Sequence, residues 1–340
     1  MTRSATIATI AGEVGVSVTT VSKVLNGRSD VAPETRARIE ESLERHRYRR
    51  RSKRQPTGAT RIDLVFHELD SAWAMEIIRG VEAAAAAAKV DMVLTQLGGA
   101  HRPSQQWVDE VLARRPLGVL LVLCGLTQPQ QQQLQRQNIP FVVLDTDSAT
   151  SASVPTVGSN NWNGAVLATR HLLELGHRRI AVISGPEDVL CSQARVAGFR
   201  SAHDEAGLPV DPDLVRYGNF YVDAGYEHGI QLLSRPDRPT AIFAGSDMQA
   251  MGVLRAARRL GLDVPRDLSV VGYDNLPVAA WLGPALTTVN QPLRDMADTA
   301  TRMLLDLARG LEPSTSRVDL VTELVVREST AAPGAPRWGR

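Results

Sequence analysis

Cysteine is scarce in this 340-residue chain, and long apolar runs are absent from it. Its two cysteines, Cys124 and Cys191, stand among apolar or small residues, which favours reduced thiols over a disulfide scaffold. No stretch of about 18 apolar residues occurs, and the N-terminus has no apolar leader segment, so neither a membrane span nor export is expected. We therefore expect a cytoplasmic protein.

Signatures of common catalytic sites are also missing. The chain contains no GxSxG nucleophile turn, no GxGxxG dinucleotide loop and no phosphate-binding P-loop. His171 and His177 do not share one face of a helix at their spacing, and we interpret the scattered histidines as solvated or hydrogen-bonded surface groups. We expect no catalytic residue, no metal site and no cofactor, so the chain is not predicted to be an enzyme.

The chain is too long for a single hydrophobic core, and its charge is distributed unevenly. The net charge is only +1, but residues 1–61 carry 13 Lys and Arg against 6 Asp and Glu, whereas the remainder carries 25 against 31. A basic end on a mildly acidic body is typical of a protein that presents one end to nucleic acid.

The basic end begins with a short amphipathic helix. Its apolar face is formed by residues at helical spacing, namely Ile7, Ile10, Ala11 and Val14. Thr6 is predicted as the N-cap, and Gly15 as the residue that ends the helix.

A second helix is predicted to start after the N-cap candidate Ser17. Its buried side would comprise Val21, Val24 and Leu25, and its polar side Thr19, Ser22, Lys23 and Asn26. Two such helices around a short turn form a helix-turn-helix, whose second helix enters the major groove of DNA. There Val18 would meet a thymine methyl group, Thr19 a base, and Lys23 a guanine or a phosphate. A plain two-helix corner in an α-helical domain fits the same pattern.

A third helix is predicted from Pro33, which suits a first turn, with Ile39 and Leu43 on its buried side. From Ala11 to Glu40 the chain reads AGEVGVSVTTVSKVLNGRSDVAPETRARIE, and here it resembles the LacI family of bacterial transcription regulators. The resemblance implies an all-α helix-turn-helix head over residues 1–48. Its expected DNA contacts are Thr6, Ser17, Val18, Thr19, Ser22, Lys23 and Asn26.

A run of arginines follows the predicted head. Residues 49–61 are expected to form a basic linker in which Arg49, Arg50 and Arg51 touch the DNA backbone, with a solvated flexible tether as the alternative. LacI-like proteins usually carry here a short helix with a leucine that wedges into the minor groove. This chain has no leucine between Leu43 and Leu64, so the sequence leaves open whether it kinks its operator.

From Ile62 short apolar strands alternate with amphipathic helices, which predicts parallel sheets covered by helices on both faces. We expect an α/β effector-binding domain over residues 62–328, built of two doubly wound parallel-sheet subdomains. The resemblance to the LacI family continues through VGSNNWNGAVLATRHLLELGHRRIAVISGP, RVAGFRSA, TAIFAGSDMQAMGV, DLSVVGYDN and LTTVNQPL. It implies a fold like that of periplasmic sugar-binding proteins, with a ligand clamped between the subdomains.

The resemblance implies three crossovers between the subdomains, near residues 155–160, 288–292 and 311–317. The N-subdomain would then hold about 62–157 and 290–312, and the C-subdomain about 158–289 and 313–328. Residues 317–326 are predicted as one strand, and residues 329–340 as a disordered tail.

Polar and aromatic residues follow several predicted strands, where open α/β sheets bind ligands. Carboxylates, amides and an arginine beside aromatic rings suit a sugar, because they bind hydroxyl groups and cover C–H faces. Matched to the family's motifs, the effector contacts would be Glu68, Ser71, Trp73, Asn160, Arg195, Phe220, Ser246 and Asp274, with Leu293 as a further candidate. The chain departs from the family pattern over residues 68–73, at Asn160 and at Ser246, so the identity of the ligand stays open. Four neighbours are interpreted as structural: Asp247 and Asn161 as helix N-caps, and Trp162 and Trp281 as core or interface residues.

These features predict a sequence-specific DNA-binding transcription regulator, a repressor of carbohydrate genes whose operator affinity is controlled by a sugar. A homodimer is favoured over a coiled-coil tetramer, since no heptads follow Glu328. The alternatives are a sugar-binding protein of the transport-receptor type without a regulatory role, and a regulator that uses a non-sugar corepressor. The head argues against a receptor, and the two subdomains argue against a constitutive architectural DNA binder.

Overall fold

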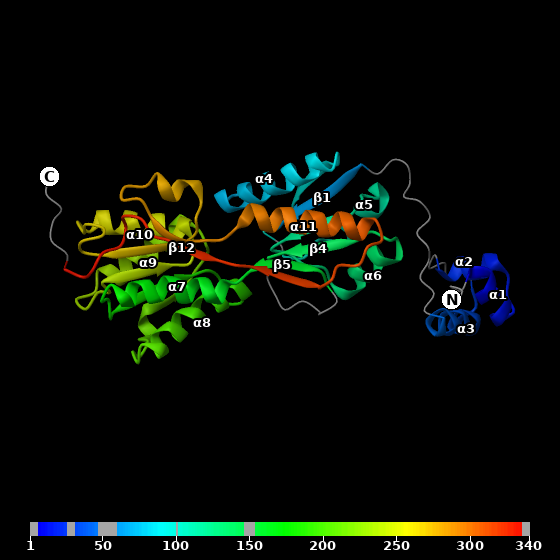
Figure 1. Cartoon of the computed structure of the whole chain (residues 1–340), viewed down its shortest axis with the longest axis horizontal. Helices are drawn as coiled ribbons and strands as arrows, with labels where there is room; N and C mark the ends of the chain where they lie inside the picture. The colour runs from blue at the N-terminus through cyan, green and yellow to red at the C-terminus, as the bar shows by residue number, and fades with distance from the viewer. Residues whose placement is uncertain (1–5, 26–30, 47–59, 100, 146–153, 335–340) are drawn as a thin grey trace.

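The computed structural model describes residues 6–25, 31–46, 60–99, 101–145 and 154–334. Figure 1 shows a small N-terminal helical domain and a larger body that contains two sheets. Within the described residues no single helix is long and apolar enough to cross a membrane. One helix pair, Ile7–Val14 with Val18–Val24, passes by length and composition, but it is bent by 103°.

Three helices form the N-terminal domain, called the head below: α1 (Ile7–Val14), α2 (Val18–Leu25) and α3 (Pro33–Arg45). Thr6 caps α1 by accepting a hydrogen bond from the Thr9 amide, and Gly15 ends the helix at a φ of 72°, which glycine adopts without strain. The three helices share a core around Ile10, Val21 and Ile39, each fully buried. The predicted helix-turn-helix and its third helix are confirmed.

The first sheet has six parallel strands in the order β11-β5-β4-β3-β1-β2. They are β1 (Arg61–Phe66), β2 (Asp91–Gln96), β3 (Val119–Val122), β4 (Phe141–Leu144), β5 (Thr156–Ser159) and β11 (Arg317–Leu320). The helices that cover this sheet are α4 (Ala72–Ala87), α5 (Gln105–Arg114), α6 (Gln128–Arg136) and α11 (Leu293–Ala308). This sheet and its helices form the N-subdomain.

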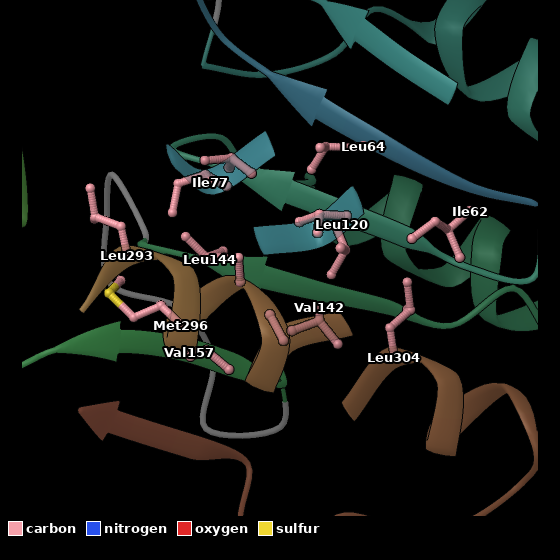
Figure 2. Close-up of a cluster of buried hydrophobic side chains, with 14 of the residues drawn as sticks. Ile62, Leu64, Ile77, Leu120, Val142, Leu144, Val157, Leu293, Met296 and Leu304 are labelled. Atoms are coloured by element: carbon pink, nitrogen blue, oxygen red, sulfur yellow. The ribbon is translucent and has the colours of Figure 1, made fainter. Parts of the chain in front are cut away.

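Side chains of the first sheet alternate between its two faces. Ile62, Leu64 and Phe66 of β1 pack with Ile77 of α4 and Met296 of α11, as Figure 2 shows for most of this cluster. The intervening residue Val65 instead joins Trp107 of α5 and Leu134 of α6. Helices therefore bury both faces, as the near-continuous apolar strands predict.

The second sheet has the order β12-β10-β9-β8-β6-β7, with β12 antiparallel to β10 and the other pairs parallel. Its strands are β6 (Ile180–Ser184), β7 (Val215–Tyr217), β8 (Ala241–Ala244), β9 (Ser269–Asp274), β10 (Thr287–Asn290) and β12 (Glu323–Val325). The helices that cover this sheet are α7 (Asn161–Glu174), α8 (Leu190–Glu205), α9 (Val222–Leu233) and α10 (Asp247–Arg259). Two 3-10 helices, η1 (Pro212–Leu214) and η2 (Pro277–Ala280), lie in its connecting segments. Ile180 and Val182 pack on α7 and α8, whereas Ala181 and Ile183 face α9 and α10. This sheet and its helices form the C-subdomain.

Neither β5 nor β7 is predicted from the sequence. β5 reads TVGS, and its Gly and Ser resemble the approach to a helix more than a strand. β7 reads VRY, and all three residues are half-buried, so it lacks the alternation of a strand with one buried face.

The chain passes between the two sheets three times: after β5, after β10 and after β11. The third crossover is predicted too early. Arg317–Leu320 is a strand of the N-subdomain, so this segment is wrongly assigned to the C-subdomain, and the chain crosses between Leu320 and Glu323. The predicted single strand is thus two edge strands of different sheets, because an extended segment can change sheets without a break in its pattern.

The predicted disordered tail from residue 329 is also wrong at its start. Ser329 is fully buried, donates a hydrogen bond to the Val270 carbonyl at 2.6 Å and accepts one from the Thr287 amide at 2.8 Å. The Ala331 amide donates to Ser269 Oγ at 3.0 Å. Composition does not show such tertiary contacts. Residues 335–340 lie outside the described part of the chain.

Both cysteines are free and buried, as expected of reduced thiols. Two of the histidines, however, are not surface groups. His177 is buried, and its ring makes hydrogen bonds to the Thr240 and Ser269 hydroxyls at 2.9 and 3.0 Å. His203 is buried beside Phe199, and burial lowers the pKa of both histidines.

Candidate effector cavity and DNA interface

The outward face of α2 carries most of the residues predicted to read DNA. Ser17 caps the helix by accepting a hydrogen bond from the Thr20 amide at 3.0 Å. Val18 and Thr19 are exposed, and Ser22 and Lys23 are half-buried. Thr6, at the cap of α1, is exposed as well. Asn26, Arg49, Arg50 and Arg51 lie outside the described residues.

A polar cluster joins the end of α1 to the end of α3. Glu13 accepts hydrogen bonds from Arg45 at 2.6 Å and Ser42 at 3.1 Å, and lies 2.5 Å from His46 Nε2. The contact with His46 is the main cause that lowers the pKa of Glu13. The cluster fixes the end of α3, from which the arginine-rich linker leaves the head. The sequence does not predict this cluster, because its members are far apart along the chain.

A cavity of about 200 Å³ lies between the two subdomains. Of the eight predicted effector contacts, seven line it: Glu68, Ser71, Trp73, Arg195, Phe220, Ser246 and Asp274. The eighth, Asn160, is exposed outside this cavity and caps α7 by accepting a hydrogen bond from the Asn163 amide at 3.0 Å. Leu293 is buried in the core of the N-subdomain.

The cavity lies where the strands of both sheets end. Glu68 follows β1 and Asp145 follows β4 in the N-subdomain, while Ser246 follows β8 and Asp274 ends β9 in the C-subdomain. Parallel strands bring their carboxyl ends to one edge of a sheet, so residues far apart in sequence meet there. This rule places the candidate residues at an edge of each sheet, and the resemblance to the family implies that the two edges enclose one ligand.

The helix caps near the cavity are one residue away from those predicted. Ser246 caps α10 by accepting a hydrogen bond from the Gln249 amide at 2.9 Å, and Asn160 caps α7. The capping role expected of Asp247 and Asn161 is therefore wrong. Both are buried: Asn161 accepts a hydrogen bond from Arg195 of α8, and Asp247 accepts bonds from the Leu276 amide and Thr288.

Arg195 of α8 is the centre of a buried hydrogen-bond network. Its Nε donates to Asn161 Oδ1 at 2.9 Å, its Nη2 donates to Gln291 Oε1 at 3.4 Å, and its Nη1 donates to the Gly245 carbonyl. Gln291 in turn donates to Asp145 Oδ2 at 3.3 Å. The network joins the C-subdomain to the N-subdomain through the second crossover.

The charge of Arg195 faces aromatic rings and a buried carboxylate. Its guanidinium carbon lies 3.7 Å from the centre of the Tyr273 ring and 5.3 Å from that of Phe220, distances typical of cation–π contacts. Its Nη2 lies 4.0 Å from Asp274 Oδ1. Burial raises the pKa of Asp274 well above its ordinary value, and Arg195 opposes that shift. A ligand here would meet a charged donor and a carboxylate, both shielded from water.

A hydrogen bond between two lining residues of the cavity joins the subdomains. Tyr221 Oη of the C-subdomain donates to Glu68 Oε2 of the N-subdomain at 2.9 Å. Burial, followed by the contact with Glu68, raises the pKa of Tyr221 to about 12, so the phenol keeps its proton at neutral pH. The bond holds the two subdomains together at the cavity.

Sequence reasoning missed several residues of the cavity. Tyr221, Asp145 and His101 line it without being predicted, whereas His67, which also lines it, directly follows the first predicted strand and is a candidate on that ground. The two imidazole rings stack with their centres 4.8 Å apart. Asp145 is the residue at the carboxyl end of a predicted strand, so the rule that ligands bind at strand ends could have identified it. His101 lies in a loop whose sequence has no recognisable pattern. The described residues contain no group of three or more His, Cys, Asp or Glu that could hold a metal ion.

The two tryptophans interpreted as core or interface residues are exposed in the single chain. Trp281 is 78% exposed and Trp162 is 44% exposed. Core packing is thus excluded for both, and an interface role remains a prediction.

Removing the hydrogen bond between Tyr221 and Glu68 should make the cavity more accessible. In Tyr221→Phe the bond to Glu68 is lost at a cost of about 1 kcal/mol. The arrangement in which the two subdomains separate at the cavity should then become about fivefold more populated. Cys191, which lines the cavity, should then be alkylated about fivefold faster. Buried Cys124 serves as the control in the same chain, and mass spectrometry separates the two peptides. Equal rates at Cys191 in both proteins would show that this bond does not hold the two subdomains together.

Comparisons with known proteins agree with this geometry. Residues 6–51 match the model of bacterial regulatory proteins of the lacI family, and residues 169–330 match that of a periplasmic binding protein-like domain. The chain is 34% identical to the HTH-type transcriptional repressor PurR of Salmonella arizonae over 337 residues, which cover 96% of this chain and 97% of that protein.

Two solved structures share both parts of the chain. The complex of the transcriptional regulator CelR with cellobiose is 33% identical with a TM-score of 0.73, covering 96% of this chain and 99% of that one. The lac repressor dimer bound to operator and the anti-inducer ONPF is 26% identical with a TM-score of 0.70, covering 97% and 100%.

Proposed function

This chain belongs to the LacI family of bacterial regulatory proteins, and from that membership we propose that a sugar bound in the cavity controls its binding to DNA. It is a DNA-binding transcriptional repressor with an effector-binding domain. The single observation that carries the sugar proposal is the buried Arg195–Asp274 pair, which lies in the cavity beside the Phe220 ring. The regulated genes would then be genes of carbohydrate use.

The chemistry of the cavity walls suits a sugar. Glu68 and Asp274 offer carboxylate oxygens that accept hydrogen bonds from hydroxyl groups, and Arg195 donates to hydroxyl oxygens. The rings of Trp73 and Phe220 offer flat apolar surfaces to the C–H faces of a sugar. The cellobiose complex of CelR, at 33% identity over nearly the whole chain, supports the same class of ligand.

The head supplies binding to operator DNA. With α2 in the major groove, Val18, Thr19 and Lys23 would meet base edges, and the arginines of the linker would neutralise phosphates without reading sequence. A homodimer, like the lac repressor dimer on its operator, would bind two half-sites related by its two-fold axis. A protein that acts on chromosomal operators works in the cytoplasm.

The two functions are coupled through the crossovers. A sugar that binds one arrangement of the subdomains better shifts the population toward that arrangement, and so changes the spacing of the two heads in the dimer. Linkage makes the effect reciprocal: operator DNA changes the affinity for the sugar by the same factor. The Glu68–Tyr221 bond and the Arg195–Gln291–Asp145 chain are the contacts between subdomains that such a shift would rearrange.

A thermal-shift screen of the full chain tests the sugar proposal. Cellobiose, D-glucose, D-ribose and maltose would be compared with the purine bases guanine and hypoxanthine. We expect at least one sugar to raise the Tm by several degrees, since a ligand at about 100 times its Kd adds about 2.7 kcal/mol of stability. The shift should vanish in Asp274→Ala. A purine that raises the Tm where no sugar does would overturn the proposal in favour of a non-sugar corepressor.

A further inference from the structure

Asp247 is a fully buried carboxylate that lies beside the cavity without lining it. It is the first residue of α10, whose cap is Ser246. Its Oδ2 accepts a hydrogen bond from the Leu276 amide at 2.7 Å, and its Oδ1 accepts one from Thr288 Oγ1 at 2.5 Å. Asp247 therefore joins α10 to the loop after β9 and to β10.

The loop that Asp247 holds has a strained backbone. Asp274 has a φ of 108° and Asn275 a φ of 56°, two consecutive non-glycine residues on the side of φ that L-residues avoid. Such conformations persist only where the surrounding structure imposes them, and they concentrate at functional positions. The strained pair includes the carboxylate that lines the cavity opposite Arg195.

The strained pair is anchored at Asn275 and at the residue that follows it. Asn275 is held by its side chain, which donates to Asn290 Oδ1 at 3.0 Å and accepts from Arg327 Nη2 at 2.7 Å. The peptide that follows the pair is held by Asp247, through the Leu276 amide. Gly272 makes room for this contact, because a Cβ atom there would collide with Asp247 Oδ1. The carboxylate of Asp247 is thus a fixed support for the loop after β9.

We propose that Asp247 is a positioning residue for the effector: it holds Asp274 in the backbone conformation that presents its carboxylate to the cavity. The proposal rests on the proposed function in one respect, namely that Asp274 contacts the effector. It gives the Asp of the SDMQA stretch a role other than helix capping.

Alanine and asparagine separate positioning from simple loss of charge. Asp247→Ala removes the acceptor for the Leu276 amide, whereas Asp247→Asn keeps an oxygen that can accept that bond and an NH₂ group that can donate to Thr288. Burial raises the pKa of Asp247, which favours the protonated form that asparagine mimics. Asparagine should therefore rescue the positioning.

A matched control comes from the N-subdomain. Asp63 is also a fully buried aspartate in a single described ion pair, with Arg114 Nη2 at 2.9 Å, and it does not line the cavity. Asp63→Ala should lower the Tm as Asp247→Ala does. It should leave the β9 loop unchanged, so any effect of lost stability alone would appear in both variants.

The deciding experiment measures amide hydrogen exchange over residues 274–276 in the full-length protein without ligand. We expect exchange about fivefold faster in Asp247→Ala than in the wild type, because the Leu276 amide loses its hydrogen bond, and near wild-type rates in Asp247→Asn and Asp63→Ala. Titration with cellobiose, the probe sugar, should show at least about tenfold weaker binding in Asp247→Ala alone.

Wild-type exchange over residues 274–276 in Asp247→Ala would overturn the proposal. So would cellobiose binding weakened no more by Asp247→Ala than by Asp63→Ala. The exchange measurement needs no ligand, so it decides the positioning role even if cellobiose does not bind the wild type. That last result counts against cellobiose as the effector and, if the other sugars also fail, against sugar control.

Discussion

Replacing Arg195 with alanine should abolish the effector response and lower the free energy of unfolding by about 3–5 kcal/mol. Arg195 is 3% exposed, and its removal leaves the buried carboxylates Asp274 and Asp145 without their nearby cation. It also leaves the Gly245 carbonyl and the Asn161 side chain without a donor. The expected loss is large because these groups are shielded from water, which would otherwise replace the missing partner.

Three variants make this result specific. Arg195→Lys keeps the charge but cannot supply the planar fork of donors, so it should recover part of the stability and little of the effector response. Arg200→Ala, an exposed arginine on the same helix, should change neither. Asp274→Ala should abolish the effector response in the same way, while operator affinity stays near that of the wild type in each folded variant.

Calorimetry gives the stability of these variants, and operator binding with and without the stabilising sugar gives the response. Operator binding should be measured well below the Tm of Arg195→Ala. A full sugar-dependent change in operator binding by Arg195→Ala would place the effector site elsewhere.

The fold was largely accessible from the sequence because its main signals are local. The boundaries of α1 and the start of α2 follow from nearby residues: the caps Thr6 and Ser17 and the stop at Gly15. The alternation of apolar strands and amphipathic helices likewise fixes two doubly wound sheets. What the sequence could not show is where one extended segment leaves a sheet, since β11 and β12 differ only in their neighbours.

The candidate site was accessible for a different reason. The carboxyl ends of parallel strands place Ser246 and Asp274 at one edge of the second sheet and Glu68 at an edge of the first, and all three residues line the cavity. Contacts that depend on tertiary packing could not be predicted from the sequence. Asp247 is a residue type common at helix N-caps, but it accepts a hydrogen bond from the Leu276 amide, 29 residues away. Tyr221 donates a hydrogen bond to Glu68, 153 residues away.

Replacing Lys23 with alanine should cost the head most of its specific binding to the operator. Lys23 lies on the outer side of α2, away from the buried Val21 and Val24, so the head should keep its fold. If Lys23 contacts a guanine, operator affinity should fall by about 1–3 kcal/mol while affinity for random DNA changes little. If it contacts only a phosphate, both affinities should fall alike, and the log–log salt slope should become shallower by about 0.9.

Two titrations over a salt series, with the operator and with a scrambled duplex, distinguish these results for Lys23→Ala. Lys89→Ala is the matched control, because that lysine follows α4 in the N-subdomain and should leave both titrations unchanged. We expect the operator-selective result, since Lys23 lies one helical turn after Thr19 on the same face of α2, and Val18 and Thr19 are exposed at the N-terminal end that reaches base edges in a helix-turn-helix. Unchanged operator affinity in Lys23→Ala would mean that this face of α2 does not enter the groove, and the DNA contacts assigned to it would have to move to another surface of the head.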